Sequence, residues 1–318
     1  MRQLGPSQLD ALGAPFSQAP GTATLLPMNA PATPDWIVPV SSAERAASRL
    51  SPESDQAARA ALKTHGAVIL RGAFPVPVVD EIRAEFDRQW GGLSAGEMAA
   101  RAQGPAPNPV LRVGENRFEI LVRMQGALGD PRLFANHLLC SFLVGVLDQR
   151  MKLSGMTAVL SYPGAQRQHI HSDSYRLFDE SGLSGSLPHY AINVALPLVD
   201  VDQTIGPTAI WLGSHLWNDS GRNPSMSEGT SVDFLRGDCI LIDYRTLHAG
   251  LPNTSTIARP ILYMVYARTW FFDEDNHRSR PSLDMPIDHF MRLPPSVREL
   301  VTRAFSQRIR AHYFSTRN

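Results

Sequence analysis

Two short stretches of this sequence carry residue types that could bind one divalent metal together. His171 and Asp173 form a His-X-Asp pair, and His248 lies far downstream. Residues two apart on a β-strand face the same side, so His171 and Asp173 could both reach one ion while Ser172 points away. Two imidazoles and one carboxylate leave three neighbouring coordination positions free, which is typical of non-haem Fe(II) that activates dioxygen. The spacing therefore indicates an oxygenase.

A basic residue follows the distant histidine. Arg259 lies directly before the alternating apolar run 260–266. A guanidinium beside an apolar strand is unfavourable without a partner anion. In a pocket it could bind a carboxylate through two parallel hydrogen bonds. A dicarboxylic cosubstrate would supply that partner.

Each of these residues also has a purely structural interpretation. His171 and Asp173 could be a hydrogen-bonded pair on a strand surface, and His248 could be a turn histidine. Arg259 could pair with a surface acid, but the combination favours a metal site. His169 shares the strand parity of the pair, yet three successive ligands on one strand face would span too far to surround one ion. We expect His169 behind the ligands or in the core.

In these motifs the sequence resembles the phytanoyl-CoA dioxygenase-like family of Fe(II)/2-oxoglutarate-dependent oxygenases, from about Ala67 to Arg268. The residues that carry the resemblance are Gln168-X-X-His171-X-Asp173, Gly206-Pro207-Thr208, Gly213-Ser214-His215, Gly237-Asp238, His248 and Arg259. The resemblance implies Fe(II), 2-oxoglutarate as cosubstrate, and dioxygen. By it, the iron ligands are His171, Asp173 and His248, Arg259 holds the distal carboxylate of 2-oxoglutarate, Gln168 and Thr208 contact the cosubstrate, and His215 supports a turn.

The resemblance further implies oxidation of an unactivated C–H bond in a small molecule, with hydroxylation as the default and desaturation or cyclisation as variants. Tailoring of a natural product suits a free-standing enzyme of this size. Residues expected at the substrate rim are Arg117, Arg123, Met124 and Tyr175. Two alternatives remain open: a metal-dependent jelly-roll enzyme that does not use 2-oxoglutarate, such as a cupin-like dioxygenase or a zinc hydrolase, and a non-catalytic jelly-roll binding protein.

The composition favours a globular protein without a charged macromolecular partner. The chain has 318 residues, 43% of them hydrophobic, which is enough for one large domain. Thirty basic residues balance thirty acidic ones, so neither nucleic acid nor a membrane is expected as partner. Cys140 and Cys239 are too few for a disulfide framework. With no signal-peptide pattern at the N-terminus, these features predict a cytoplasmic protein; the oligomeric state stays open.

Local patterns predict helices first and short strands afterwards. Residues 1–35 are expected to form a flexible arm and residues 36–318 a single domain. Helices are expected over Ser51–Gly66, Val76–Trp90, Pro131–Leu147 and Pro295–Arg308. Strands are expected over Ala67–Leu70, Arg117–Met124, Thr157–Tyr162, His169–Asp173, Tyr190–Leu198, Thr208–Leu212, Ser231–Leu235, Cys239–Asp243 and Pro260–Trp270. This order predicts a mainly β protein with flanking helices (α+β) and a double-stranded β-helix, or jelly-roll, core over about 156–272.

Overall fold

The computed structural model describes residues 33–175, 177–178, 182–218 and 222–304. Its strands are β1 Ile37–Pro39, β2 Ala67–Arg71, β3 Val110–Gly114, β4 Arg117–Leu121, β5 Lys152–Ser161, β6 Ala191–Pro197, β7 Thr208–Ile210, β8 Cys239–Asp243, β9 His248–Gly250 and β10 Arg259–Ala267. Its α-helices are α1 Ser42–Ala47, α2 Pro52–His65, α3 Val76–Trp90, α4 Ala95–Arg101, α5 Pro131–Phe134, α6 His137–Val146, α7 Ile287–Arg292 and α8 Pro295–Leu300. Short 3-10 helices span Gly126–Gly129, Ser184–Ser186, Ser214–Leu216 and Met226–Glu228.

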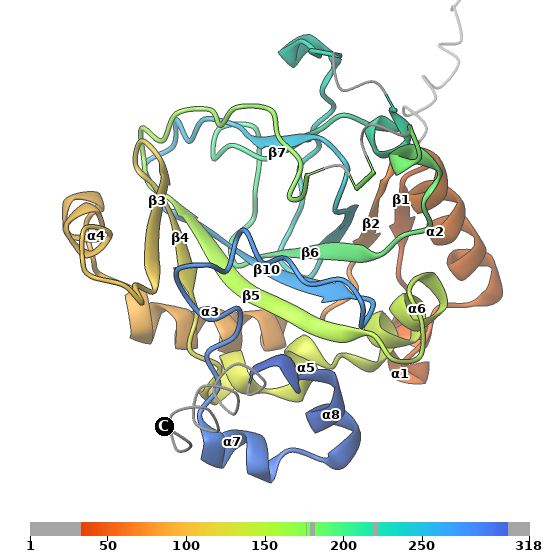
Figure 1. Cartoon of the computed structure of the whole chain (residues 1–318), viewed down its shortest axis with the longest axis horizontal. Coiled ribbons are helices and arrows are strands. Elements are labelled where there is room, and N and C mark those ends of the chain that lie inside the picture. Colours follow the sequence, from red (N-terminus) through yellow and green to blue (C-terminus); the bar gives the residue numbers. More distant parts are fainter. Residues whose placement is uncertain (1–32, 176, 179–181, 219–221, 305–318) are drawn as a thin grey trace, which may run out of the picture. The chain divides into compact units, whose positions relative to one another are not determined.

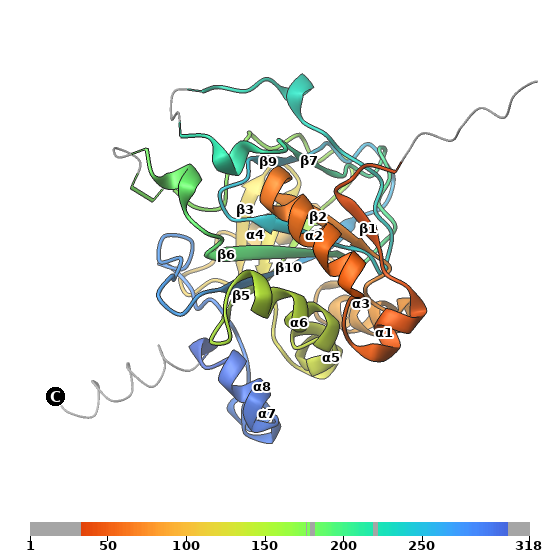
Figure 2. The same ribbon diagram turned by 90° about the vertical axis from the view of Figure 1, so that its right-hand side faces the viewer.

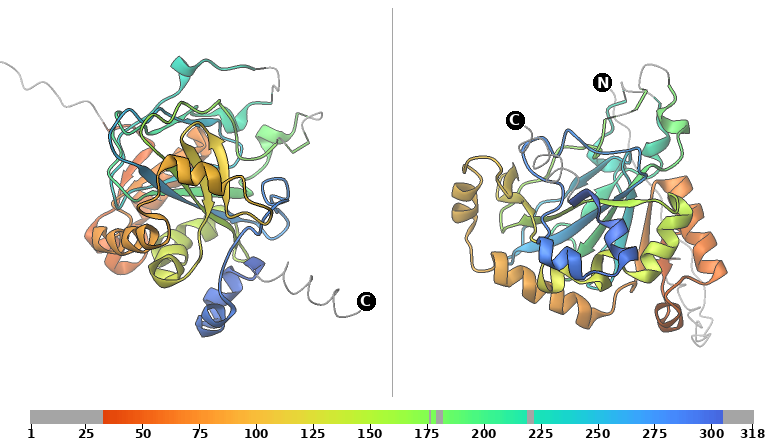
Figure 3. Two further views of the ribbon diagram at one scale, coloured as in Figure 1. Left: turned by 90° about the vertical axis from the view of Figure 1, so that its left-hand side faces the viewer. Right: turned by 60° about the horizontal axis from the view of Figure 1, so that its bottom comes forward.

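Eight strands form one large sheet in the order β1-β2-β8-β6-β10-β5-β4-β3. All neighbours in it are antiparallel except β1 and β2. A second, two-stranded sheet, β7-β9, lies over one face of the large sheet, whereas α3, α5 and α6 lie on the other (Figures 1 and 2). Seen from below, α3 and the pair α7 and α8 also lie on that helical side (Figure 3, right). The site must therefore form between the two sheets, away from the helices.

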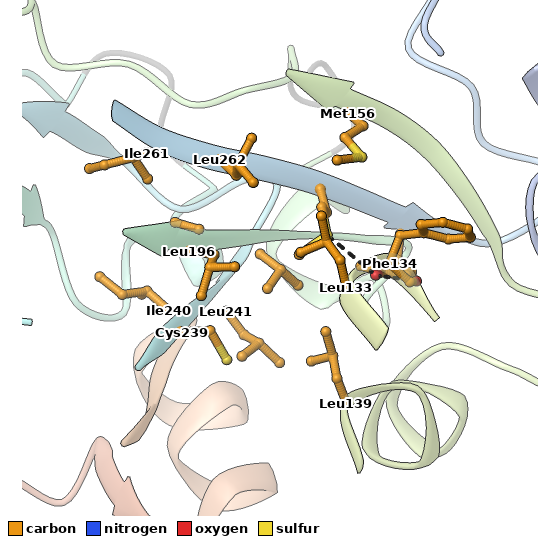
Figure 4. Packing of buried hydrophobic residues seen from close by; sticks show 14 of the residues in the cluster. Leu133, Phe134, Leu139, Met156, Leu196, Cys239, Ile240, Leu241, Ile261 and Leu262 are labelled. Carbon is orange, nitrogen blue, oxygen red and sulfur yellow. Dashed lines mark hydrogen bonds between the residues drawn. The ribbon is translucent and has the colours of Figure 1, made fainter. Parts of the chain in front are cut away.

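The helical face of the large sheet is apolar because its strands alternate. Met156 of β5, Leu262 of β10 and Leu196 of β6 point toward Leu133 and Leu139 of the helical layer (Figure 4). All five side chains are fully buried. Burial of one such side chain contributes about 1.5–3 kcal/mol. This packing fixes the strands that carry the site on their opposite face.

The fold class predicted from the sequence is confirmed, as are several elements. α3 and β8 have the predicted bounds, and α2 lies between its N-cap Ser51 and its C-cap Gly66. The Ser51 hydroxyl accepts a hydrogen bond from the Ser54 amide, as expected of a helix-capping serine. None of the helices among the described residues combines the length and the apolar character that crossing a bilayer requires.

Three predicted elements are wrong. Residues 169–173 form no strand, since His171 makes only an isolated bridge to His248. Residues 231–235 likewise contribute only a bridge between Phe234 and Val201. The helix expected over 131–147 is broken at Asn136, whose side chain caps the second part, α6, by accepting from the Leu139 amide. Local side-chain bonds and loop geometry here override the apolar periodicity.

The predicted domain limits stay predictions. Residues 1–32 of the expected arm lie outside the described residues, as do residues 305–308 of the expected last helix, of which α8 covers Pro295–Leu300. The sheet extends well beyond the predicted core of 156–272, because β1 to β4 join it from the N-terminal side. Strands β1, β3 and β9 and helices α1, α4 and α7 were not expected from the sequence.

The C-terminal end of α2 supports the segment that leads into β9. Gly66 ends the helix with a positive φ of 72°. Its carbonyl accepts a hydrogen bond from the Thr246 hydroxyl at 2.9 Å, and the Thr246 carbonyl lies 3.0 Å from His248 Nδ1. The buried ring of His215 lies 3.1 Å through Nε2 from the Lys63 carbonyl. The turn-supporting role expected of His215 therefore has a structural counterpart in its contact with the end of α2.

Gly66→Ala should destabilise the fold more than an ordinary glycine substitution at positive φ. A Cβ at Gly66 would overlap the buried Thr246 and His215 side chains, so we expect a loss of about 2 kcal/mol or more in the free energy of unfolding. Gly92→Ala is the matched control, with φ 76° and no atom within 4 Å of the added Cβ, and should lose only about 1 kcal/mol. Urea denaturation measures both; equal losses would contradict the packing argument.

His215 should make stability depend on pH. Burial lowers its pKa to about 4, below the value of about 6.5 in an unfolded chain. The unfolded state therefore takes up a proton first, and stability is complete above pH 6.5 and declines as the pH falls toward 4. His215→Gln should reduce that slope by up to about 1.4 kcal/mol per pH unit. The slope should not vanish, because the pKa values of His171 and His277 are also lowered to about 4; an unchanged slope in urea midpoints from pH 6.5 to 4.5 would refute the role of His215.

Candidate metal and cosubstrate site

The three residues proposed as metal ligands converge between the two sheets. The main chains of His171 and His248 exchange two hydrogen bonds, of 3.1 and 2.8 Å, and their rings lie 4.5 Å apart. Asp173 Oδ1 lies 3.5 Å from His248 Nε2. One ligand atom from each residue lies within 4.8 Å of the others. Two imidazoles and one carboxylate could therefore hold a single ion of the kind that suits this donor set.

Both imidazoles are oriented through their Nδ1 atoms. His171 Nδ1 lies 2.9 Å from the carbonyl of His169, and His248 Nδ1 lies 3.0 Å from that of Thr246. A carbonyl can only accept, so Nδ1 carries the proton and the lone pair is left on Nε2. Burial, followed by the neighbouring His248, lowers the pKa of His171 to about 4, which keeps its ring neutral. His169 thus contributes its main chain here, while its own ring lies outside the triad.

Two amide side chains hold Asp173, which lies outside any regular strand. Asn193 Nδ2 on β6 donates to Asp173 Oδ2 at 2.8 Å. Asn276 Nδ2 donates to the Asp173 carbonyl at 2.9 Å. The side chain and the main chain of Asp173 are therefore held from two separate segments.

Two arginines occupy one cross-strand row of the large sheet. Ser161 of β5 pairs with Arg117 of β4 on one side and with Arg259 of β10 on the other. Both arginines are fully buried, and Arg259 Nη2 donates to the Ser161 hydroxyl at 3.0 Å. Arg117 Nη2 donates to the carbonyls of Gln166 and Leu251.

These two guanidiniums lack anionic partners. In each, Nε and Nη1 are buried and have no hydrogen-bond partner among the described residues, and no carboxylate is among the groups that shift the pKa of either. Burial, followed by the charge of Arg259, lowers the pKa of Arg117 to about 9, and burial lowers the pKa of Arg259. Both remain cationic at neutral pH. Buried unpaired cations are unfavourable, so the pair fits an anion with two or more acceptor oxygens.

Gln168 and Thr208 lie next to the arginine pair, on either side of Gly250. The Gln168 Oε1 atom accepts from the Gly250 amide at 3.0 Å, and Thr208 pairs with Gly250 across β7 and β9. A Cβ at Gly250 would overlap both Arg117 Nη1 and Gln168 Oε1. The glycine therefore keeps open the space in which these polar groups meet.

A cavity of about 380 Å³ contains the triad, Gln168, Thr208 and Gly250. Its wall also includes Glu119, whose carboxylate pairs with the buried Arg280. Burial raises the pKa of Glu119 against the opposing effect of Arg280. A wider cavity of about 910 Å³ adjoins it, shares the segment from His169 to Asp173, and is lined in part by Tyr175 and Phe272. The smaller cavity could hold a cosubstrate and the reacting part of a substrate, and the wider one could admit the remainder.

The four residues expected at the substrate rim lie in different places. Tyr175 is 79% exposed and lines the wider cavity. Arg117 lies in the buried row beside Arg259. Met124 is fully buried in the hydrophobic core, and Arg123 is an exposed residue that pairs with Asp284 at 3.4 Å. The residues that line the two cavities do not include Arg117, Arg123 or Met124.

Several cavity residues were not expected from the sequence. Asn193 could have been recognised in the sequence, because it is the polar residue in the otherwise apolar strand Ala191–Pro197. Glu119 could also have been recognised, since it shares strand parity with Arg117. His277 and Asn276 belong to a segment after β10 without periodicity, so no local pattern indicated them. Tyr244 is buried, and its hydroxyl donates a hydrogen bond to Asp273 at 2.6 Å. In the sequence it resembles an ordinary core residue.

Comparison with known proteins relates this geometry to a family. The sequence model of the phytanoyl-CoA dioxygenase (PhyH) family matches residues 62–261, more than half of the chain. The dioxygenase aneA of Aspergillus aculeatus is 26% identical over 240 residues, covering 69% of this chain and 74% of aneA. The iron/alpha-ketoglutarate-dependent dioxygenase penM of Penicillium thymicola is 27% identical over 207 residues, covering 63% and 64%.

Solved structures share the fold at low sequence identity. HygX from Streptomyces hygroscopicus, with nickel and 2-oxoglutarate bound, has a TM-score of 0.53 and 17% identity, covering 70% of this chain and 89% of HygX. AviO1 from Streptomyces viridochromogenes Tue57 has a TM-score of 0.52 and 17% identity, covering 69% and 97%. By the extent of the family match, this chain belongs to the phytanoyl-CoA dioxygenase family.

Proposed function

We propose that this chain is an Fe(II)- and 2-oxoglutarate-dependent dioxygenase that oxidises a C–H bond of a small natural product. The observation that carries the proposal is a His-Asp-His triad in a cavity whose wall at Gly250 lies directly against the buried guanidinium of Arg117, with Arg259 in the same cross-strand row. The triad fits a ferrous ion, and the arginines fit the anionic cosubstrate. Family membership supports the same activity.

The ion would be held by Nε2 of His171, Nε2 of His248 and Oδ1 of Asp173. Iron and 2-oxoglutarate, when bound, supply the oxidising power that dioxygen needs to attack an unactivated C–H bond. The protein's own residues orient the ligands, through the carbonyls of His169 and Thr246 and the amide of Asn193. Enclosure between the two sheets keeps water from the reacting groups.

Arg259 would bind the distal carboxylate of 2-oxoglutarate, with Gln168 and Thr208 as further polar contacts. We propose Arg117 as a second cation for the cosubstrate and no longer for the prime substrate. Its place in the row with Ser161 and Arg259 supports this change. Two donors left free on each guanidinium match the oxygens of a carboxylate.

The prime substrate would enter through the wider cavity past Tyr175. Glu119 and His277 line the smaller cavity and would face the part of the substrate near the reacting carbon. The solved structures of HygX with hygromycin B and of SnoN with nogalamycin RO support a natural product as substrate class. We propose hydroxylation as the outcome.

The alternatives account for less of the site. A zinc hydrolase or a cupin-like enzyme without 2-oxoglutarate would use the triad but would leave both guanidiniums without an anion. A binding protein would not need two imidazoles that are both oriented through their Nδ1 atoms. For the compartment we propose the cytoplasm, because Cys140 and Cys239 are both free thiols.

His171→Ala and Asp173→Ala should abolish the visible charge-transfer band that Fe(II) and 2-oxoglutarate give under anaerobic conditions, as well as 2-oxoglutarate-dependent succinate formation. His169→Ala is the matched control: its neighbouring, exposed ring lies outside the triad and its carbonyl is retained. The control should keep both signals. A wild-type protein without the band, or a triad variant that retains succinate formation, would refute the function.

Arg117→Met should raise the 2-oxoglutarate concentration needed for half-maximal signal by about 10- to 100-fold, since a charge-assisted hydrogen bond contributes about 1.5–3 kcal/mol. Arg123→Met is the control, because Arg123 is exposed and paired with Asp284, and it should leave that concentration unchanged. Anaerobic titration of the iron-loaded proteins measures both. If Arg117→Met leaves 2-oxoglutarate binding intact and weakens only substrate binding, the earlier assignment to the substrate rim stands.

A further inference from the structure

Asn193 is a polar residue in the middle of an apolar, central strand. All seven residues of β6 are buried, and Asn193 is the polar one among them. Its neighbours across the sheet are Val265 of β10 and Ile242 of β8. The residue is only 7% exposed. An amide in such surroundings is unfavourable unless its hydrogen bonds are made.

Only the nitrogen side of this amide has a partner. Asn193 Nδ2 donates to Asp173 Oδ2 at 2.8 Å, whereas Asn193 Oδ1 is buried without a partner in the described part of the chain. A buried unsatisfied acceptor costs about 1–3 kcal/mol. A leucine of similar size would avoid that cost. The amide is therefore a disadvantage for the fold, offset by what its nitrogen does at Asp173.

The bond makes the two oxygens of Asp173 different. Oδ2 is occupied by Asn193, and Oδ1 lies 3.5 Å from His248 Nε2 within the triad. Asp173 lies outside any regular strand. The bond from Asn276 holds its carbonyl and leaves the rotation of the carboxylate free. Asn193 is the described contact that restricts this rotation.

We propose that Asn193 is a positioning residue that restricts Asp173 to one donor oxygen, Oδ1; the inference rests on the proposed function. A carboxylate can bind a metal through one oxygen or through both. Binding through both would occupy one of the three positions that the cosubstrate and dioxygen need. The amide that occupies Oδ2 is neutral. A lysine or an arginine in its place would compensate the negative charge that the ion requires. Asn193 thereby preserves the open half of the coordination sphere.

Two variants of similar size separate this role from packing. Asn193→Leu removes the donor together with the unpaired oxygen, and Asn193→Asp keeps the shape but replaces the donor by an acceptor. The metal-free Leu variant should melt no lower than the wild type, because it loses a buried unsatisfied group. At saturating Fe(II), without oxygen and without any turnover, both variants should bind 2-oxoglutarate about 10- to 100-fold more weakly, as expected when a group that orients a metal ligand is lost.

Titration of the charge-transfer absorbance with 2-oxoglutarate provides the measurement, and competition with a coloured chelator establishes Fe(II) saturation. If the wild type gives the band and both variants bind 2-oxoglutarate within about threefold of it, this inference is wrong while the proposed function stands. If the Leu variant melts much lower and the Asp variant binds normally, Asn193 serves packing and the inference is again wrong. A wild type that gives no band overturns the proposed function and this inference together.

Discussion

Two main-chain hydrogen bonds between His171 and His248 are the contact on which the site depends. They join a loop that follows β5 to the first residue of β9, two segments far apart in the sequence. β9 is only three residues long and pairs with β7 alone among the named strands. The bridge therefore extends the small sheet by one residue pair and fixes both imidazoles at once. Any change that separates the two segments would separate the ligands as well.

The large sheet serves two opposite requirements with the same strands. On β10, Leu262 and Met264 face the helices, whereas Arg259 and Tyr263 face the site. The period of two in a strand makes this division possible. Apolar packing on the helical side holds the backbone in place, and so it allows two like charges to remain buried side by side on the other face. A strand slipped by one residue would bury Arg259 among the helices.

The sequence predicted the parts of the fold with strong local signals. The helix over Val76–Trp90 and the strand over Cys239–Asp243 follow from periodicity and apolar runs, and the candidate metal ligands follow from residue types and order. It did not predict β1 or β9, because strands of three residues carry too little pattern and exist through pairing with distant partners. The sequence also did not predict that Arg117 lies in one row with Arg259, because this follows from the pairing of Arg117 with Ser161. Strand register is a tertiary property, so Arg117 looked no different from Arg123.

Charged side chains are distributed unevenly around the cavity. Two guanidiniums without carboxylate partners among the described residues lie behind the cavity wall at Gly250, whereas Asp173 and Glu119, the latter paired with Arg280, line the cavity itself. An anionic cosubstrate would be attracted toward the wall at Gly250, two residues from the candidate ligand His248. The groups that orient the metal ligands, the carbonyls of His169 and Thr246 and the amide of Asn193, are all neutral. They orient the candidate ligands without adding charge, so the charge at a bound ion would be determined by the ligands, the ion and the cosubstrate.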